Sequence, residues 1–116
     1  MRCWFAAISI VLASAGACRA QIAIALNPTT GKAAGYNGSW DAEAVKRQAL
    51  SMCGSDCRIV ATGKGTCAAV VESISTGGSV WAVGYGTTIQ TASQNGWHEC
   101  RRRGGVSCNT AVALCD

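Results

Sequence analysis

The sequence predicts an α+β domain made of two similar halves, each with the order strand, strand, helix, strand, and stabilised by disulfides. One stretch that alternates large and small residues and further β-rich or apolar stretches predict strands, and helical spacing of apolar residues over 41–53 predicts a helix. The same order of elements occurs about twice, in residues 21–66 and 67–116. Six cysteines follow residue 20, an even number that is typical of a disulfide framework. Because one half cannot cover the apolar face of its own sheet, we expect both halves to pack into one core.

Residues 1–20 have the three parts of a secretory signal peptide: a positive start at Arg2, an uncharged apolar stretch, and small residues before a cleavage site after Ala20. The apolar stretch is shorter than the roughly 20 residues of a membrane span. A second interpretation is a lipoprotein signal with the lipid on Cys18, which the preceding alanines match poorly. We therefore expect one domain at residues 21–116, secreted or periplasmic, without a transmembrane segment.

In the first half, we expect strands at 21–26, 33–36 and 58–62 and a helix at 41–53. The first stretch alternates large and small residues at period two. Pro28 and the dipeptide Asn37-Gly38 mark the two turns. Ser39 is the expected N-cap of the helix, and Gly54 its expected end.

In the second half, we expect strands at 67–74, 80–85 and 109–115 and a helix at 88–101. Gly84-Tyr85 in this half corresponds to Gly35-Tyr36 in the first. The linking stretch Gly63–Thr66 matches part of a phosphate-binding loop, but Arg58 stands where that motif needs its first glycine. We interpret the stretch as a hairpin turn with Lys64 exposed.

The cysteines after residue 20 are expected to form three disulfides, because export leads to an oxidising compartment. They are Cys53, Cys57, Cys67, Cys100, Cys108 and Cys115. The alternative is a zinc site formed by some of them with His98, but the spacing matches no common zinc pattern. The symmetry of the halves favours Cys53–Cys57 and Cys100–Cys108 as bonds within the halves, with Cys67–Cys115 joining the two halves.

Composition and charge argue against several classes of function. The chain has 10 Lys and Arg against 6 Asp and Glu, and without Arg2 and Arg19 the balance is 8 against 6, or +2. That charge is too low to indicate nucleic-acid binding. His98 is the single histidine, and no Ser/Asp pattern or free cysteine accompanies it as a nucleophile and base would require. We expect no catalytic residue, no metal and no cofactor.

The run Arg101-Arg102-Arg103 is the most conspicuous polar feature. At the end of a helix, cations compensate the helix dipole, and Gly104-Gly105 can form the cap. One arginine would be sufficient for that role. The run is therefore also a candidate patch for an anionic surface or a protein partner.

Four aromatic residues are candidates for a surface that stacks glycans or peptides. They are Trp40, Trp81, Tyr85 and Trp97, and Trp81 and Tyr85 share one face of a strand. Burial is the alternative, because a core rich in alanine and glycine needs large side chains to fill it.

The ordered string of short motifs resembles a bacterial exported family, domain of unknown function 4189. The motifs are Ala23-Ile24-Ala25, Gly35-Tyr36, Ala49-Leu50-x₂-Cys53, Cys57, Gly65-x-Cys67-Ala68-Ala69, Val83-Gly84-Tyr85-Gly86, Cys100, Cys108 and Cys115. The resemblance implies a compact α+β fold with repeated halves in an exported protein, and it implies no activity or catalytic residue. Asn95-Gly96 departs from the family pattern and predicts a kink in the second helix.

We therefore expect an exported, non-catalytic binding module that acts on another protein or an envelope component. An inhibitor or immunity-type protein is the sharper form of this hypothesis. The alternatives are a released effector that binds host or anionic surfaces and, last, an enzyme with an unrecognised site. The sequence leaves the partner and the oligomeric state open.

Overall fold

The computed structural model describes residues 21–39, 41–75 and 78–116, and it confirms the α+β class. The elements are β1 (Gln21–Leu26), β2 (Ala33–Ser39), α1 (Ala42–Cys53), β3 (Arg58–Lys64), β4 (Cys67–Ser75), β5 (Gly78–Gly86), α2 (Ile89–Arg102) and β6 (Asn109–Cys115). The predicted leader and Trp40 lie outside the described residues. None of the helices in the described part is long and apolar enough to cross a bilayer.

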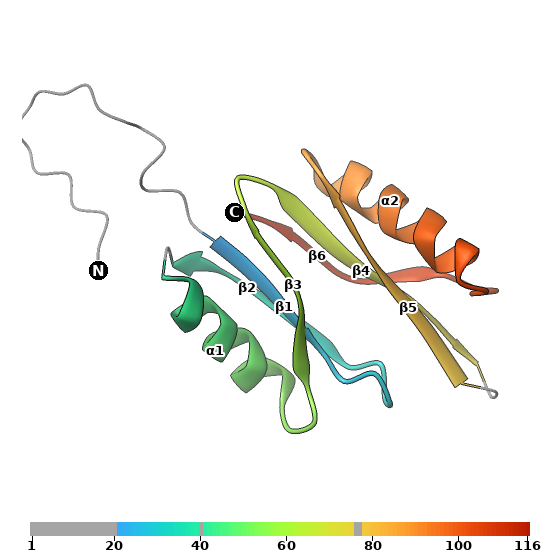
Figure 1. The fold of residues 1–116 in the computed structure, drawn as a ribbon, viewed down its shortest axis with the longest axis horizontal. Helices are drawn as coiled ribbons and strands as arrows, with labels where there is room; N and C mark the ends of the chain where they lie inside the picture. The colour runs from blue at the N-terminus through green and yellow to red at the C-terminus, as the bar shows by residue number, and fades with distance from the viewer. Residues whose placement is uncertain (1–20, 40, 76–77) are drawn as a thin grey trace, which may run out of the picture.

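The strands form two antiparallel sheets of three strands, with the orders β2-β1-β3 and β5-β4-β6. Each half contributes one sheet, its first strand lies in the centre, and its own helix packs against that sheet. The two halves therefore repeat both the order of elements and the way they are paired. In Figure 1 the sheets lie between the helices, with α1 and α2 on opposite outer sides.

The central strands are buried on both faces, which explains the continuous apolar runs 22–26 in β1 and 67–71 in β4. In β1, the large residues Ile22, Ile24 and Leu26 face the second sheet, where they meet residues such as Val70 of β4. The small alternate residues of β1 face α1. Large side chains therefore fill the space between the sheets, while alanines let each helix approach its sheet closely.

The start of α1 differs from the sequence-based prediction. Asp41 is the N-cap, because its carboxylate accepts from the backbone N–H groups of Glu43 and Ala44. The expected cap, Ser39, is instead the last residue of β2. Asn37-Gly38 is not a turn either, since Asn37 continues the pairing of β2 with Ile22 of β1.

Helix α2 runs unbroken through the position where a kink was expected. Gly96 lies on the buried face of the helix against Gly84 of β5. A Cβ on Gly84 would lie 2.1 Å from the backbone nitrogen of Gly96. The glycine in the helix is therefore explained by the close approach of two backbones, not by a bend.

The end of α2 confirms the predicted glycine cap. Gly104 has φ +99°, and its N–H donates to the carbonyl of Arg101, while the N–H of Gly105 donates to the carbonyl of Cys100. These two bonds are those of a Schellman motif. The arrangement fixes the chain as it leaves the helix toward Cys108.

The link between the halves is not a hairpin, contrary to the sequence-based prediction. It connects β3 and β4, which belong to different sheets, so the chain crosses from one layer to the other at Gly65 and Thr66. Lys64 is exposed there, as expected. At the opposite end of the sheets, the Ser79 hydroxyl donates to the carbonyl of Pro28 at 2.9 Å and joins the two halves again.

Candidate functional site

The six cysteines after residue 20 form three disulfides with the favoured pairing. The bonds are Cys53–Cys57, Cys67–Cys115 and Cys100–Cys108. The pairing uses the sulfurs of the alternative zinc set, so none of these cysteines offers a thiolate as ligand or nucleophile.

The role assigned to Cys67–Cys115 is wrong, however. Both cysteines lie in the second half, on β4 and β6, where they stand directly opposite each other in the register. The bond therefore staples neighbouring strands of one sheet rather than two halves. Packing between the sheets and a few polar contacts join the halves instead.

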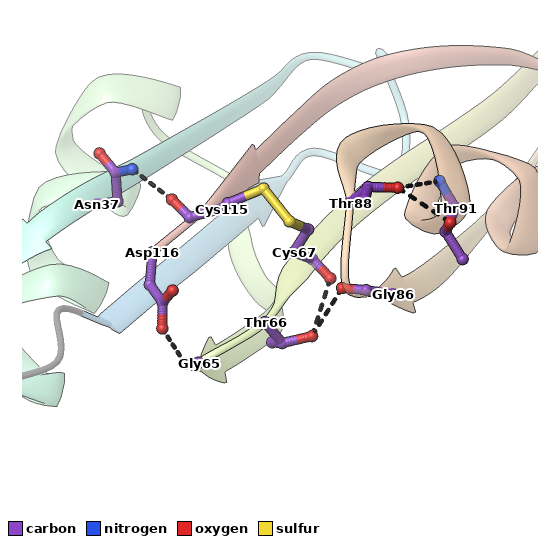
Figure 2. Close-up of a disulfide and its surroundings, with 9 residues drawn as sticks. All are labelled: Asn37, Gly65, Thr66, Cys67, Gly86, Thr88, Thr91, Cys115 and Asp116. Carbon is purple, nitrogen blue, oxygen red and sulfur yellow. Dashed lines mark hydrogen bonds between the residues drawn. A yellow bond between two sulfur atoms is a disulfide. The ribbon is translucent and has the colours of Figure 1, made fainter. Parts of the chain in front are cut away.

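Figure 2 shows those contacts around the Cys67–Cys115 bond. The Asn37 side chain of β2 donates to the carbonyl of Cys115 on β6 at 2.5 Å. The Asp116 carboxylate accepts from the N–H of Gly65 in the link between the halves. These two hydrogen bonds hold the C-terminal end of β6 against β2 and against the link between the halves, so their role is structural.

The three arginines at the end of α2 do not form a uniform patch. The Glu99 carboxylate binds Arg102 at 2.5 Å and Arg103 at 3.1 Å. These hydrogen bonds and charges lower the pKa of Glu99. Arg103 also donates to the carbonyl of Trp81 at 3.0 Å, which ties the end of the helix to β5.

Arg101 is arranged differently. Its guanidinium lies 5.2 Å from the centre of the Trp97 ring, within the range of a cation–π contact, and no carboxylate pairs with it among the described residues. The His98 and Trp97 rings are nearly perpendicular, with an interplanar angle of 80° and the ring centres 5.3 Å apart. All three side chains are exposed, and Trp97 retains 41% of its accessible surface. We call Trp97, His98 and Arg101 the Trp97 cluster.

The other candidate aromatics lie elsewhere. Trp81 and Tyr85 share one face of β5, as expected, and that face is directed toward the other sheet. Trp81 is partly buried there, with the Arg58 guanidinium 5.8 Å from its ring centre, and Tyr85 remains 44% exposed. Trp97 projects from the outer helix layer, so the described aromatics do not form one surface.

One residue that sequence reasoning missed is Glu72. It is 8% exposed, and its Oε2 atom is buried without a hydrogen-bond partner. Burial raises the pKa of its carboxyl group. The signal in the sequence is a single acid within the otherwise uncharged stretch 65–97, and a search for clusters of acids overlooks it.

These features define a small, cystine-stabilised α+β domain with a repeated sheet-and-helix half and an exposed aromatic–arginine cluster on its outer helix. The chain belongs to the family described as domain of unknown function (DUF4189), whose model matches residues 22–115. No curated protein and no solved structure shows a significant match to the chain.

Proposed function

We propose that this protein is an exported, non-catalytic binding module that acts on another protein in the cell envelope, as an inhibitor or immunity-type protein does. The observation that supports this most is the Trp97 cluster, in which an arginine without an ion pair among the described residues stacks on an exposed tryptophan. Tryptophan and arginine are the residue types most enriched among those that dominate protein–protein binding energies.

The platform under the cluster is rigid, which lowers the entropic cost of binding. Cys100, one turn from Trp97, is fully buried and bonded to Cys108, and the Schellman motif fixes the end of the helix. The opposite face of α2 packs on β5 through Gly84 and Gly96. The cluster is therefore held in one orientation before a partner arrives.

The charge distribution favours an acidic protein partner over a lipid or polymer surface. Attraction to anionic membranes grows with the number of available cations. Here Glu99 occupies Arg102 and Arg103, and Arg101 alone presents its charge beside a flat aromatic ring. A single cation next to a large apolar surface is suited to a specific contact.

Three substitutions test the proposal, and two of them, Arg101→Gln and Arg102→Gln, remove the same charge. The oxidised protein serves as bait to capture partners from envelope and secreted fractions. The affinity of each captured partner for the protein and its variants is then measured with purified components. We expect Arg101→Gln and Trp97→Ala to weaken binding about tenfold or more, as for central interface residues. Arg102→Gln, the matched control, should weaken binding far less because its side chain is already paired with Glu99.

Equal effects of Arg101→Gln and Arg102→Gln would show that overall charge and not the cluster determines binding. If only anionic vesicles bind, and the loss follows the number of arginines removed, the protein acts as a surface-binding effector instead. If the protein turns over a hydrolase substrate and His98→Ala abolishes this turnover, the protein is an enzyme and not a binding module.

A further inference from the structure

A second surface feature lies away from the Trp97 cluster, on the inner face of the second sheet. An open groove of about 220 Å³ runs between β4 and the start of β6. Its walls are Glu72, Ile74, Ser107, Asn109, Thr110 and Ala111. A dry cavity of about 150 Å³ is enough to enclose a benzene molecule, so this groove has room for one long side chain.

Glu72 gives the groove its chemical character. It lies on the central strand β4, with Asn109 of β6 opposite it on one side and Trp81 of β5 on the other. On the Trp81 side the first half closes over it, since Gly31 lies so near that a Cβ there would be 2.7 Å from Glu72 Oε1. The open side is the groove.

A buried carboxylate oxygen without a donor is unfavourable, because it has lost its hydrogen bonds to water and gained none in return, and the penalty is larger when the group is charged. Such groups in native proteins are usually satisfied by a partner or serve a function. Oε2 of Glu72 has no donor among the described residues, and no other titratable side chain lines the groove or the crevice beside Trp81. The site therefore lacks one positive charge or one strong donor.

The remaining walls indicate which cation would fit. Ser107, Asn109 and Thr110 are the polar residues of the lining, and their hydroxyl and amide oxygens can accept from a group with several N–H donors. Ile74 is 61% exposed and offers an apolar wall to an aliphatic chain. A single carboxylate is a poor metal site, and no group of three or more metal-ligating side chains occurs within the described ranges. An aliphatic stem that ends in an ammonium group matches both walls.

We infer that this groove receives a lysine side chain of a partner protein, with its stem along Ile74 and its ammonium group paired with Glu72. The site is separate from the Trp97 cluster and extends the proposed function by a second point of contact.

The probe is N-acetyl-lysine-N-methylamide, titrated into the oxidised protein and followed by backbone amide resonances. We expect saturable shifts at Asn109 and Thr110 with a millimolar Kd. The norleucine analogue, which has the stem without the charge, should bind at least tenfold more weakly. Free n-butylammonium should bind more weakly than the lysine amide, since the inferred ligand is part of a polypeptide.

Glu72→Gln should reduce lysine-amide binding at least tenfold, and Glu43→Gln on the exposed surface of α1 should leave it unchanged. A second readout needs no variant: the carboxyl carbon resonance of Glu72 should report a lower pKa when the lysine amide is present. Equal binding of the norleucine analogue, or an unchanged Glu72 titration at saturating lysine amide, would overturn the inference. Tighter binding of n-butylammonium than of the lysine amide would reject a polypeptide ligand.

Discussion

The packing of α2 on its sheet depends on the contact between Gly84 and Gly96. In Gly84→Ala, the added Cβ would lie 2.1 Å from the nitrogen of Gly96 and 2.2 Å from the carbonyl oxygen of Ala92, whereas ordinary contact begins near 3.4 Å. Both obstacles are backbone atoms, which no side-chain rotation can remove. The helix must therefore move outward by roughly 1 Å, a gap that forfeits a quarter to a half of the dispersion energy of each contact.

We expect this substitution to lower the free energy of unfolding by about 3 kcal/mol or more, at the upper end of the costs of overpacking. That loss is a large part of the total stability of a small domain, which is roughly 5–15 kcal/mol. Urea unfolding of the oxidised protein, followed by tryptophan fluorescence, measures the difference.

Gly35→Ala is the matched control, because its Cβ would meet only the ends of the Leu114 and Val112 side chains, at 2.9 and 3.2 Å. Those side chains can rotate, so we expect a loss of about 1 kcal/mol or less. If Gly84→Ala and Gly35→Ala cost the same, the backbone contact is not what positions α2.

Two further predictions concern the disulfides and the buried acid. Alanine at both Cys67 and Cys115 removes a bond that closes a loop with a sequence separation of 48, and chain entropy predicts that the free energy of unfolding falls by about 4 kcal/mol. Alanine at both Cys53 and Cys57 removes a bond with a separation of 4, and the expected fall in urea unfolding is about 2 kcal/mol. The reverse order would contradict that explanation. Because burial raises the pKa of Glu72 above its unfolded value, its stabilising effect is complete below the unfolded pKa and is lost as the pH rises through the folded pKa. As the pH rises above 4.5, the ordinary pKa of a glutamate, the free energy of unfolding of the wild type should therefore fall relative to that of Glu72→Gln, and a constant difference would refute the shift.

Much of the fold could be predicted from the sequence because its local signals agree. Period-two alternation in β1, helical spacing in α1 and the recurrence of both in the second half identified the order of elements. The wrong details are those in which a long-range contact outweighs a local preference. Asn37-Gly38 favours a turn by itself, but its pairing with β1 and the bond from Asn37 to Cys115 keep it in a strand.

The candidate site was less accessible to such reasoning. The sequence identifies three adjacent arginines, but it does not show that Glu99 occupies two of them and leaves Arg101 on Trp97. The spacing of three and four residues from Glu99 is the local signal that could have indicated this pairing. Glu72 could not have been found in the same way, since its isolation depends on how two sheets and a turn close around it.

The central claim is that each disulfide joins two cysteines of the same half. The disulfide pattern of the protein from its natural source tests this claim most directly. Trypsin leaves Cys53 and Cys57 in one peptide, residues 48–58, and the other four cysteines in residues 65–101 and 104–116. Chymotrypsin at the aromatic residues and thermolysin within residues 109–114 then separate the remaining two bonds. Mass spectrometry should find Cys53–Cys57, Cys67–Cys115 and Cys100–Cys108 in a chain without residues 1–20. Free thiols, a bond from Cys67 to Cys53 or Cys57, or an intact leader would contradict the account.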